Sequence, residues 1–332
     1  MAKTRKPKKV AAASKRSKGQ APTRQSKGTV GIVGLGIMGG AFARLLKIAG
    51  WRVVGYDISA ARRLAARDRG IRIVRNATEV AQRASAVLTS LPSAKALESV
   101  VNEITGAKLP PITLVELSTF ALVDKQKAER RMRKAKHTML DVPVSGTGAQ
   151  AARGDAVFYA SGDKAAIKRL MPLFTDIGRA AYDVGAFGNG SKMKYVANLL
   201  VAIHNIASAE AMVLGMKAGL PPQAILEMVS AGAGQSRIFD LRGPMMVKND
   251  YDNVTATLDV FDKDLRLIGD FVRATRVPTP LFDATRPIYD KALKCGLGAK
   301  DAAAVCAVLE KMARLKRHKT PNAPKVRAAA QA

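Results

Sequence analysis

Residues able to carry acid–base chemistry stand in the segment GNGSKMKYVANLL, residues 188–200. Lysine is one of the side chains that can give a proton to a reacting group or take one from it. Lys194 and Asn198 are four residues apart and would share one face of a helix, whereas Lys192 would project from another face. The spacing favours Lys194 with Asn198 as the functional pair, and Lys192 is the competing lysine.

A second polar segment, DVPVSGTGAQAARGDAVFYASGD, begins at Asp141. Ser145, Gly146 and Thr147 follow in a predicted loop that would expose several backbone N–H groups. Such a loop could hold the carboxylate or phosphate of a substrate. A plain turn without a ligand is the alternative.

A glycine-rich turn must be positioned opposite these groups. Residues 30–33 read as a buried strand, and Gly34, Gly36 and Gly39 then give the G-x-G-x-x-G spacing that leads into a helix. This arrangement brings the pyrophosphate of a dinucleotide against bare backbone at a helix N-terminus. Asp57 ends the next strand, where a carboxylate can accept the ribose hydroxyls of NAD. A turn without a ligand is the alternative here too.

The surrounding elements indicate an α/β fold. Short apolar runs alternate with helical patterns, which predicts a doubly wound parallel sheet of the Rossmann type. The predicted strands lie at 30–33, 52–56, 71–74, 86–88, 112–118 and 138–142, and predicted helices lie at 60–69, from about 78, and at 122–135.

An all-helical C-terminal domain should follow. One long apolar helix is predicted from Ser191 to about Ala218, with further helices near 222–231, 257–275 and 283–294. The predicted organisation is a basic tail (1–28), a dinucleotide-binding domain (29–187), a helical domain (188–315) and a second basic tail (316–332).

The net charge of +29 is concentrated at the two ends of the 332-residue chain. Residues 1–28 hold ten Lys or Arg and residues 311–332 hold seven, with no acidic residue in either segment. We expect disordered tails, of which the first could contact nucleic acid weakly and non-specifically or have no partner. No membrane-spanning run, signal peptide or metal-ligand spacing of the two cysteines is visible, which favours a cytoplasmic protein without a metal.

Six motifs in order carry a family resemblance: GLGIMGG near the start, LP at 91–92, ST at 118–119, DVPVSGTGAQAARG at 141–154, GNGSKMKYVAN at 188–198 and KDLRL at 263–267. Over about residues 29–310 the chain resembles the β-hydroxyacid dehydrogenases, which include 3-hydroxyisobutyrate, tartronate semialdehyde and glyoxylate/succinic semialdehyde enzymes. The resemblance implies an NAD(P)-dependent oxidoreductase. It would move a hydride between the cofactor and a small β-hydroxy acid or the matching semialdehyde or keto acid, as a homo-oligomer.

The resemblance also implies residue roles. Lys194 would be the catalytic acid and base, Asn198 would orient the substrate, and Ser145, Gly146 and Thr147 would cradle its carboxylate. Because a free lysine amine titrates near pH 10.4, we expect desolvation or neighbouring cations to lower the pKa of Lys194. The cofactor would contact Gly34, Leu35, Gly36, Ile37, Met38, Gly39, Asp57, Leu91, Pro92, Thr119 and Lys263.

Departures from the family pattern bear on the ligands. Thr147 stands where many members have glycine, and Arg237 stands where many have tryptophan, so the substrate could differ and Arg237 could meet a second anionic group. Asp57 favours NAD over NADP, because a carboxylate repels a 2′-phosphate. Arg62 and Arg63 could support some NADPH binding, although the solvent face of the next helix is their expected place.

Two other functions are weighed against this one. A catalytically silent member could be tethered to nucleic acid by its basic tail, but such a member would be free to lose Lys194. Imine reduction occurs in related enzymes with the lysine replaced, so its retention argues against that reaction. His204, ten residues beyond Lys194, is expected to be a core or interface histidine.

Overall fold

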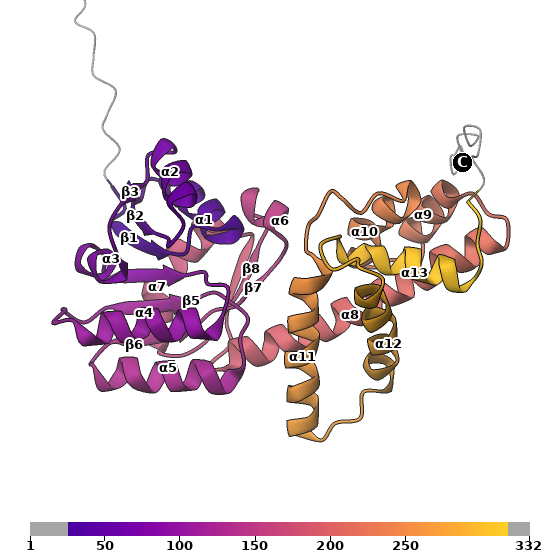
Figure 1. Cartoon of the computed structure of the whole chain (residues 1–332). Coiled ribbons are helices and arrows are strands. Elements are labelled where there is room, and N and C mark those ends of the chain that lie inside the picture. The colour runs from indigo at the N-terminus through magenta and orange to yellow at the C-terminus, as the bar shows by residue number, and fades with distance from the viewer. Residues whose placement is uncertain (1–25, 318–332) are drawn as a thin grey trace, which may run out of the picture.

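The computed structural model describes residues 26–317, which form two lobes (Figure 1). The N-terminal lobe is a sheet covered by helices, and the C-terminal lobe is helical. Helix α8 (Asn189–Lys217) begins at the first lobe and runs through the second. The predicted fold class, a Rossmann-type sheet followed by a helical domain, is confirmed.

The main sheet has six parallel strands in the order β3-β2-β1-β4-β5-β6, as in doubly wound dinucleotide-binding folds. The predicted strands correspond to β1 (Thr29–Val33), β2 (Arg52–Tyr56), β3 (Arg72–Ile73), β4 (Ala86–Thr89), β5 (Thr113–Glu116) and β6 (Thr138–Asp141). They were readable as apolar runs because both faces of the sheet are covered. The carboxyl ends of these strands meet at one edge, where a ligand crevice is expected.

Helices cover the two faces of this sheet with separate apolar cores. One face carries α1 (Ile37–Ile48), α2 (Ala60–Asp68) and α7 (Lys164–Ile177), and the other carries α3 (Ala77–Arg83), α4 (Ala94–Gly106) and α5 (Leu122–Lys134). Several begin at a residue whose side-chain oxygen accepts a backbone N–H of the first turn, which satisfies an otherwise unpaired donor: Ser59, Asn76, Ser93 and Asp163.

A small second sheet, which was not predicted, follows the main sheet in the chain. It contains β7 (Val144–Ser145), β8 (Val157–Ala160) and β9 (Ala180–Asp183), with the short helix α6 (Gly148–Ala152) after β7. The ring of Phe158 on β8 lies between those of Phe42 and Phe174, with centroids 5.4 and 5.6 Å away. This buried aromatic row fixes the second sheet, and with it the polar loop after β7, against the first lobe.

The helical lobe packs around α8. The predicted helices correspond to α9 (Pro222–Ala231), α11 (Leu258–Thr275) and α12 (Pro280–Lys294), whereas α10 (Arg237–Lys248) and α13 (Val305–Met312) were not predicted. Pro244 was expected to separate helices but lies inside α10, as does Gly243. Gly243 is needed for close packing, because a Cβ there would lie 2.6 Å from the Leu226 side chain of α9.

Helix α8 meets the length and hydropathy of a membrane span, with a mean hydropathy of 1.6. The core helix of a globular lobe passes the same test, and here α10, α11, α12 and α13 pack against α8. It nevertheless exposes several large apolar side chains, namely Met193, Val196, Leu200 and Leu214.

Two residues assigned to the tails contact the folded body. Lys27 Nζ forms an ion pair with Asp176 at 2.8 Å, and the Arg317 guanidinium binds Glu310 and the backbone carbonyl of Val247. The expected disorder of the tails and their contact with nucleic acid concern residues 1–25 and 318–332, which lie outside the described residues.

Candidate active site

The turn after β1 has the geometry that a dinucleotide requires. Gly34 has a φ of +92°, and a Cβ on it would lie 2.1 Å from the Ser90 carbonyl oxygen. A Cβ on Gly39 would lie 1.9 Å from the Gly34 carbonyl oxygen, so both glycines are needed for packing. A Cβ on Gly36 would instead meet only the Arg62 guanidinium, 3.6 Å away. The bare backbone at Gly36, which caps α1 without a side chain, fits a pyrophosphate.

The other predicted turn residues differ in exposure. Leu35 is buried and Met38 packs partly against the core. Ile37 is 81% exposed, and it lies so close to α6 that a Cβ on Gly148 would approach its side chain to 2.4 Å. Of these three, Ile37 is therefore the one whose side chain is open to a ligand.

Asp57 directly follows β2 and is buried. One carboxylate oxygen accepts the Leu35 N–H at 2.7 Å, and the other accepts the Ser59 N–H at 2.8 Å. Arg62 Nη1 lies 3.6 Å from the carboxylate, and Arg63 Nη1 donates to the Asp57 carbonyl oxygen at 2.7 Å. Arg62 is exposed on α2, as expected, although its guanidinium lies near the acid, whereas Arg63 is half-buried and turns back to bind the Asp57 backbone.

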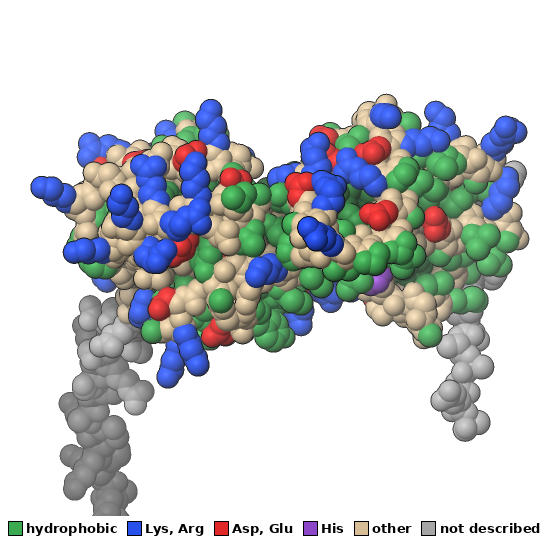
Figure 2. Space-filling model, turned by 90° about the horizontal axis from the view of Figure 1, so that it is seen from below, with side chains coloured by type: hydrophobic (Ala, Val, Ile, Leu, Met, Phe, Trp, Pro, Cys, Tyr) green, Lys and Arg blue, Asp and Glu red, His purple; other side chains and the backbone are tan. Residues whose placement is uncertain are grey.

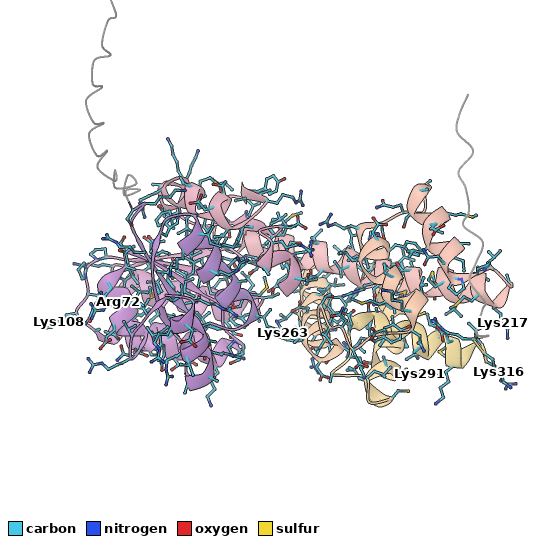
Figure 3. The ribbon with its side chains drawn as sticks, turned by 90° about the horizontal axis from the view of Figure 1, so that it is seen from above. Arg72, Lys108, Lys217, Lys263, Lys291 and Lys316 are labelled. Atoms are coloured by element: carbon cyan, nitrogen blue, oxygen red, sulfur yellow. The ribbon has the colours of Figure 1, made fainter. Side chains whose placement is uncertain are left out.

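The ends of β4 and β5 meet beside the inter-lobe junction. The Leu91 N–H donates to the Ser118 hydroxyl at 2.9 Å, which ties the two strand ends together, and Pro92 follows as an exposed residue. Lys263, on α11 of the helical lobe, donates from Nζ to the Thr119 carbonyl oxygen at 2.6 Å. Figure 3 places Lys263 where the two lobes meet. These predicted cofactor residues thus come together at one place.

Lys194 is buried on α8, with 8% of its surface exposed. Burial lowers its pKa from the ordinary 10.5 to about 8, with the nearby cation of Lys263 acting in the same direction and the carboxylate of Asp264 opposing it. The amine is therefore suited to exchanging protons near neutral pH. The competing Lys192 is exposed and donates to the Asn189 side chain at 3.2 Å, so the structure favours Lys194.

Asp264 is a site residue that sequence reasoning missed. Its carboxylate accepts a hydrogen bond from Asn198 Nδ2 at 2.9 Å and pairs with Lys263 Nζ at 2.9 Å. It thereby fixes the amide of Asn198, four residues from Lys194, and balances two lysines. The KDLRL motif contains Asp264, but nothing in its spacing connects it to Asn198 on another helix.

The predicted carboxylate loop is held by an unforeseen polar network. The Thr147 N–H donates to Gln150 Oε1 at 2.9 Å, and the Gln150 N–H donates to Thr147 Oγ1 at 3.3 Å, which is a capping box at the start of α6. The Thr147 N–H is therefore occupied, while its hydroxyl proton can still donate to a ligand. Ser145 and Gly146 precede it on the same partly exposed loop.

That network reaches the helical lobe through Asp155. Gln150 Nε2 donates to Asp155 at 3.1 Å, and Asp155 pairs with Arg179 at 3.0 Å and with Arg237 at 2.7 Å. These partners hold the pKa of the Asp155 carboxyl below its ordinary value, with Gln150 having the largest effect. Arg237, at the start of α10, therefore joins the helical lobe to the loop instead of presenting an unpaired charge.

A buried charge cluster supports the start of α8. Lys125 is fully buried, with Nζ 2.6 Å from Glu116 and 2.8 Å from Asp141. Burial alone would lower the pKa of Lys125, but the two carboxylates raise it; burial also raises the pKa of Glu116. Asp141 accepts the Ser191 N–H at 2.7 Å and the Ser191 hydroxyl at 2.9 Å. Ser191 is one turn before Lys194, so the cluster anchors that turn to the sheet.

Other candidate residues lie apart from this junction. His204 is half-buried, and its carbonyl oxygen accepts the Ser208 hydroxyl at 2.5 Å. Cys306 is buried and Cys295 exposed, and both are free. Within residues 26–317 no three His, Cys, Asp or Glu side chains are grouped to hold a metal ion.

Two family models match the chain. One is described as the NAD binding domain of 6-phosphogluconate dehydrogenase and matches residues 29–186. The other is described as NAD-binding of NADP-dependent 3-hydroxyisobutyrate dehydrogenase and matches residues 188–309. Each lobe is thus matched by a model of a nicotinamide-dependent dehydrogenase.

Individual proteins agree with these models. L-threonate dehydrogenase of Escherichia coli is 34% identical to this chain, and the alignment covers 84% of this chain and 94% of the relative. L-threonate dehydrogenase of Cupriavidus necator is 32% identical, and the alignment covers 84% of this chain and 95% of the relative. The crystal structure of 3-hydroxyisobutyrate dehydrogenase from Salmonella typhimurium has a TM-score of 0.77 at 31% identity, over 84% of this chain and 99% of that one. With the glycine turn and strand order described above, these matches place the chain in the β-hydroxyacid dehydrogenase family, as an NAD(P)-dependent enzyme acting on CH–OH donors.

Proposed function

We propose that this enzyme transfers a hydride between the nicotinamide cofactor and a small hydroxy acid, or the matching semialdehyde or keto acid, with Lys194 as the acid and base. The observation that carries the proposal is the buried amine of Lys194, whose pKa is lowered to about 8. It stands on the helix that links the cofactor lobe to the helical lobe.

In the oxidative direction the neutral amine of Lys194 takes the proton of the substrate hydroxyl group while the C–H hydride leaves the same carbon, which becomes a carbonyl. The bound cofactor supplies the hydride acceptor, and in the reverse direction the hydride donor. For reduction the ammonium form of Lys194 returns the proton to the carbonyl oxygen. Asn198, fixed by Asp264, would hold the reacting oxygen next to the amine.

The substrate carboxylate would bind at the loop after β7. The hydroxyl protons of Thr147 and Ser145 and the backbone N–H of Gly146 can donate to an anion there. The names of the relatives, L-threonate dehydrogenase and 2-(hydroxymethyl)glutarate dehydrogenase, support a hydroxy acid as the substrate class. Because Arg237 is already paired with Asp155, we propose a substrate with a single carboxylate.

A substrate screen tests this function. NAD⁺ or NADP⁺ reduction would be followed at 340 nm with L-threonate, 3-hydroxyisobutyrate and the dicarboxylate 2-(hydroxymethyl)glutarate. We expect turnover with a monocarboxylate hydroxy acid and a higher KM for the dicarboxylate. Absence of turnover with every hydroxy acid, in both directions and with both cofactors, would contradict the proposal.

For cofactor preference we propose NAD. The Asp57 carboxylate lies at the end of β2, where the ribose hydroxyls of NAD are expected, and it would repel a 2′-phosphate. The two neighbouring arginines reduce that repulsion, so we expect NADPH to be accepted with a higher KM. Comparing KM for the two reduced cofactors tests this order, and a clear preference for NADPH would contradict it.

We also propose that the enzyme is a homo-oligomer in the cytoplasm. Met193, Val196 and Leu200 stand three and four residues apart on α8, and each is more than 40% exposed. A second copy covering this stripe would remove it from water. Light scattering should give a mass above that of one chain, and Leu200→Glu should reduce it; a monomeric wild-type protein would refute the idea. Cell fractionation tests the compartment.

A further inference from the structure

A groove lined by arginines lies over the outer edge of the main sheet, away from Lys194. It is an open hollow of about 580 Å³ between α2, β3 and α3. Four of its eight lining residues are arginines: Arg63, Arg72, Arg75 and Arg83. We call it the arginine groove. In Figure 3, Arg72 lies at the side of the first lobe that faces away from the helical lobe.

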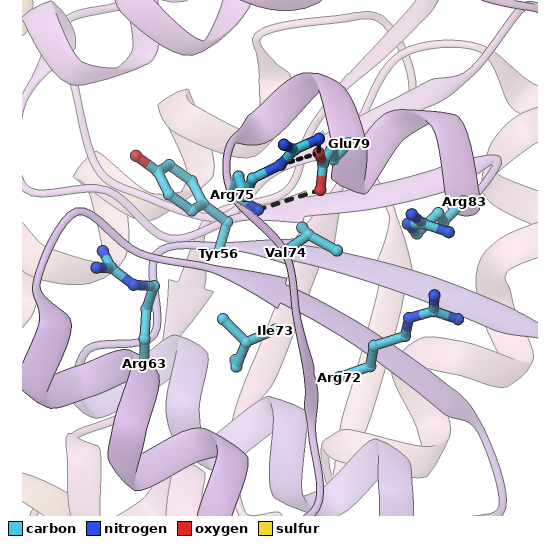
Figure 4. A pocket seen from close by; sticks show the side chains of 8 residues that line it. All are labelled: Tyr56, Arg63, Arg72, Ile73, Val74, Arg75, Glu79 and Arg83. Atoms are coloured by element: carbon cyan, nitrogen blue, oxygen red, sulfur yellow. Dashed lines mark hydrogen bonds and ion pairs between the residues drawn. The ribbon is translucent and has the colours of Figure 1, made fainter.

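The charges in the arginine groove are poorly balanced. Glu79 is its single acidic lining residue, and it is engaged by Arg75, with Arg75 Nε 2.6 Å from its carboxylate. Arg72 and Arg83 form no side-chain hydrogen bond or ion pair with any residue from 26 to 317. Figure 4 shows these two side chains at one end of the groove, with Arg63 and Tyr56 at the other. Unpaired guanidinium groups of this kind suit a phosphoryl anion, which they bind through paired N–H donors.

Basic side chains are common on the first lobe (Figure 2), so charge alone would not single out this place. Two other features distinguish the arginine groove from the rest of this basic surface: it is hollowed, and it lies next to the residues around Asp57. Tyr56 lines the groove and directly precedes Asp57, and Arg63 lines it while donating to the Asp57 and Ile58 carbonyl oxygens at 2.7 and 3.0 Å. The groove therefore opens beside the place where the ribose of the cofactor is expected.

We propose that the arginine groove binds a phosphate monoester, with its phosphoryl group held by Arg72 and Arg83. The ligand would be a separate phosphorylated metabolite, because Arg72 and Arg83 lie at the end of the groove away from Tyr56, Asp57 and the expected ribose. This site is additional to the hydroxy-acid site and does not depend on the role of Lys194.

The test uses the full chain at 0.15 M salt, where long-range charge effects are largely screened. Inorganic phosphate is titrated by calorimetry into protein saturated with NADH, which blocks the pyrophosphate site at the glycine turn. In a second arm the affinities for NADPH and NADH are compared without phosphate. The variant is Arg72→Gln/Arg83→Gln, and the control is Arg130→Gln/Arg131→Gln, which removes the same charge from exposed positions on α5.

We expect the groove variant to bind phosphate about tenfold more weakly, the effect of losing one or two charge-assisted hydrogen bonds. The control variant should match the wild type. The NADPH-to-NADH affinity ratio should stay the same in the groove variant; a tenfold change in it would show that the groove belongs to the cofactor site and would overturn the proposal. The proposal is also wrong if phosphate binding does not respond, or if the control responds equally.

Discussion

The pH dependence of oxidation should report the pKa of Lys194. The neutral amine is the form that accepts the hydroxyl proton, so kcat/KM for oxidation should rise with pH and level off above about 8. At pH 7 a pKa of about 8 leaves about one tenth of the amine neutral, against about one part in 3,000 for the ordinary value of 10.5. Burial therefore increases the reactive fraction about 300-fold.

The two charged neighbours of Lys194 allow this pKa to be moved in opposite directions. Lys263→Gln removes a cation and should raise the pKa, whereas Asp264→Asn removes an anion and should lower it, each by about one unit. Asp264→Asn keeps an amide oxygen that can still accept from Asn198. The assay is the initial rate of oxidation from pH 6 to 10.5 with saturating cofactor.

Asp270→Asn serves as the matched control. Asp270 is also on α11, but it is exposed and pairs with Arg273, so its removal should leave the pH profile unchanged. The reasoning would be refuted by a wild-type profile without a break between pH 7 and 9. It would equally be refuted if Lys263→Gln and Asp264→Asn moved the break in the same direction.

Three further changes test other parts of the site. Lys125→Met leaves two buried carboxylates without their cation. Urea titration should show a loss of about 3–5 kcal/mol in the free energy of unfolding. A loss below about 1 kcal/mol would contradict the buried pairing. Asp57→Asn should raise KM for NADH about tenfold and change KM for NADPH less. The measurement is the KM for each reduced cofactor. An equal change in both KM values would exclude Asp57 as the residue that selects NAD over NADP. Arg237→Asp should raise KM for the substrate about threefold at nearly unchanged kcat, because a half-exposed ion pair contributes under 1 kcal/mol. Adding Asp155→Arg to the same chain should restore the wild-type KM. Failure of the double variant to restore KM would exclude the pairing.

The Rossmann core could be predicted from sequence because its signals are local. Gly34, Gly36 and Gly39 stand within six residues, and most of the strands contain a short apolar run. The long α8 was predicted from its apolar surface, to within two residues at each end. Such patterns need no knowledge of distant contacts.

The small sheet and α7 were missed for different reasons. β7 has only two residues, and its partner β8 lies more than ten residues further on. β8 is a short apolar run, VFYA, but it stands inside the polar segment from Asp141 to Asp163 that was considered for its anion-binding loop. The signal for α7 was present, because Asp163 caps a helix that buries Ile167, Leu170 and Phe174 at helical spacing. Pro172 lies inside that segment, as Pro244 lies inside α10, and a proline in a helix interior is an unfavourable signal for a helix.

The charged members of the site were the least predictable. Lys125 lies among Lys, Arg and Glu residues of α5, where a solvent-facing position is the natural reading, and its partners Glu116 and Asp141 are 9 and 16 residues away. Asp141 was read as the entry to a loop, yet it caps the start of α8. Asp264 was recognisable only as part of a family motif. In each case the partner comes from another element, and single-sequence spacing carries no information about it.

The proposed acid–base role rests on Lys194, and Lys192 offers a matched control two residues away on the same helix. The most direct measurement compares Lys194→Met with Lys192→Met in steady-state oxidation of the substrate found by the screen, together with the dissociation constant of NADH. We predict that Lys194→Met keeps the NADH affinity within about twofold and loses at least about 100-fold in kcat, the usual scale of general acid–base catalysis, while Lys192→Met stays near the wild type. A Lys194→Met enzyme that retains wild-type turnover would contradict the proposed mechanism.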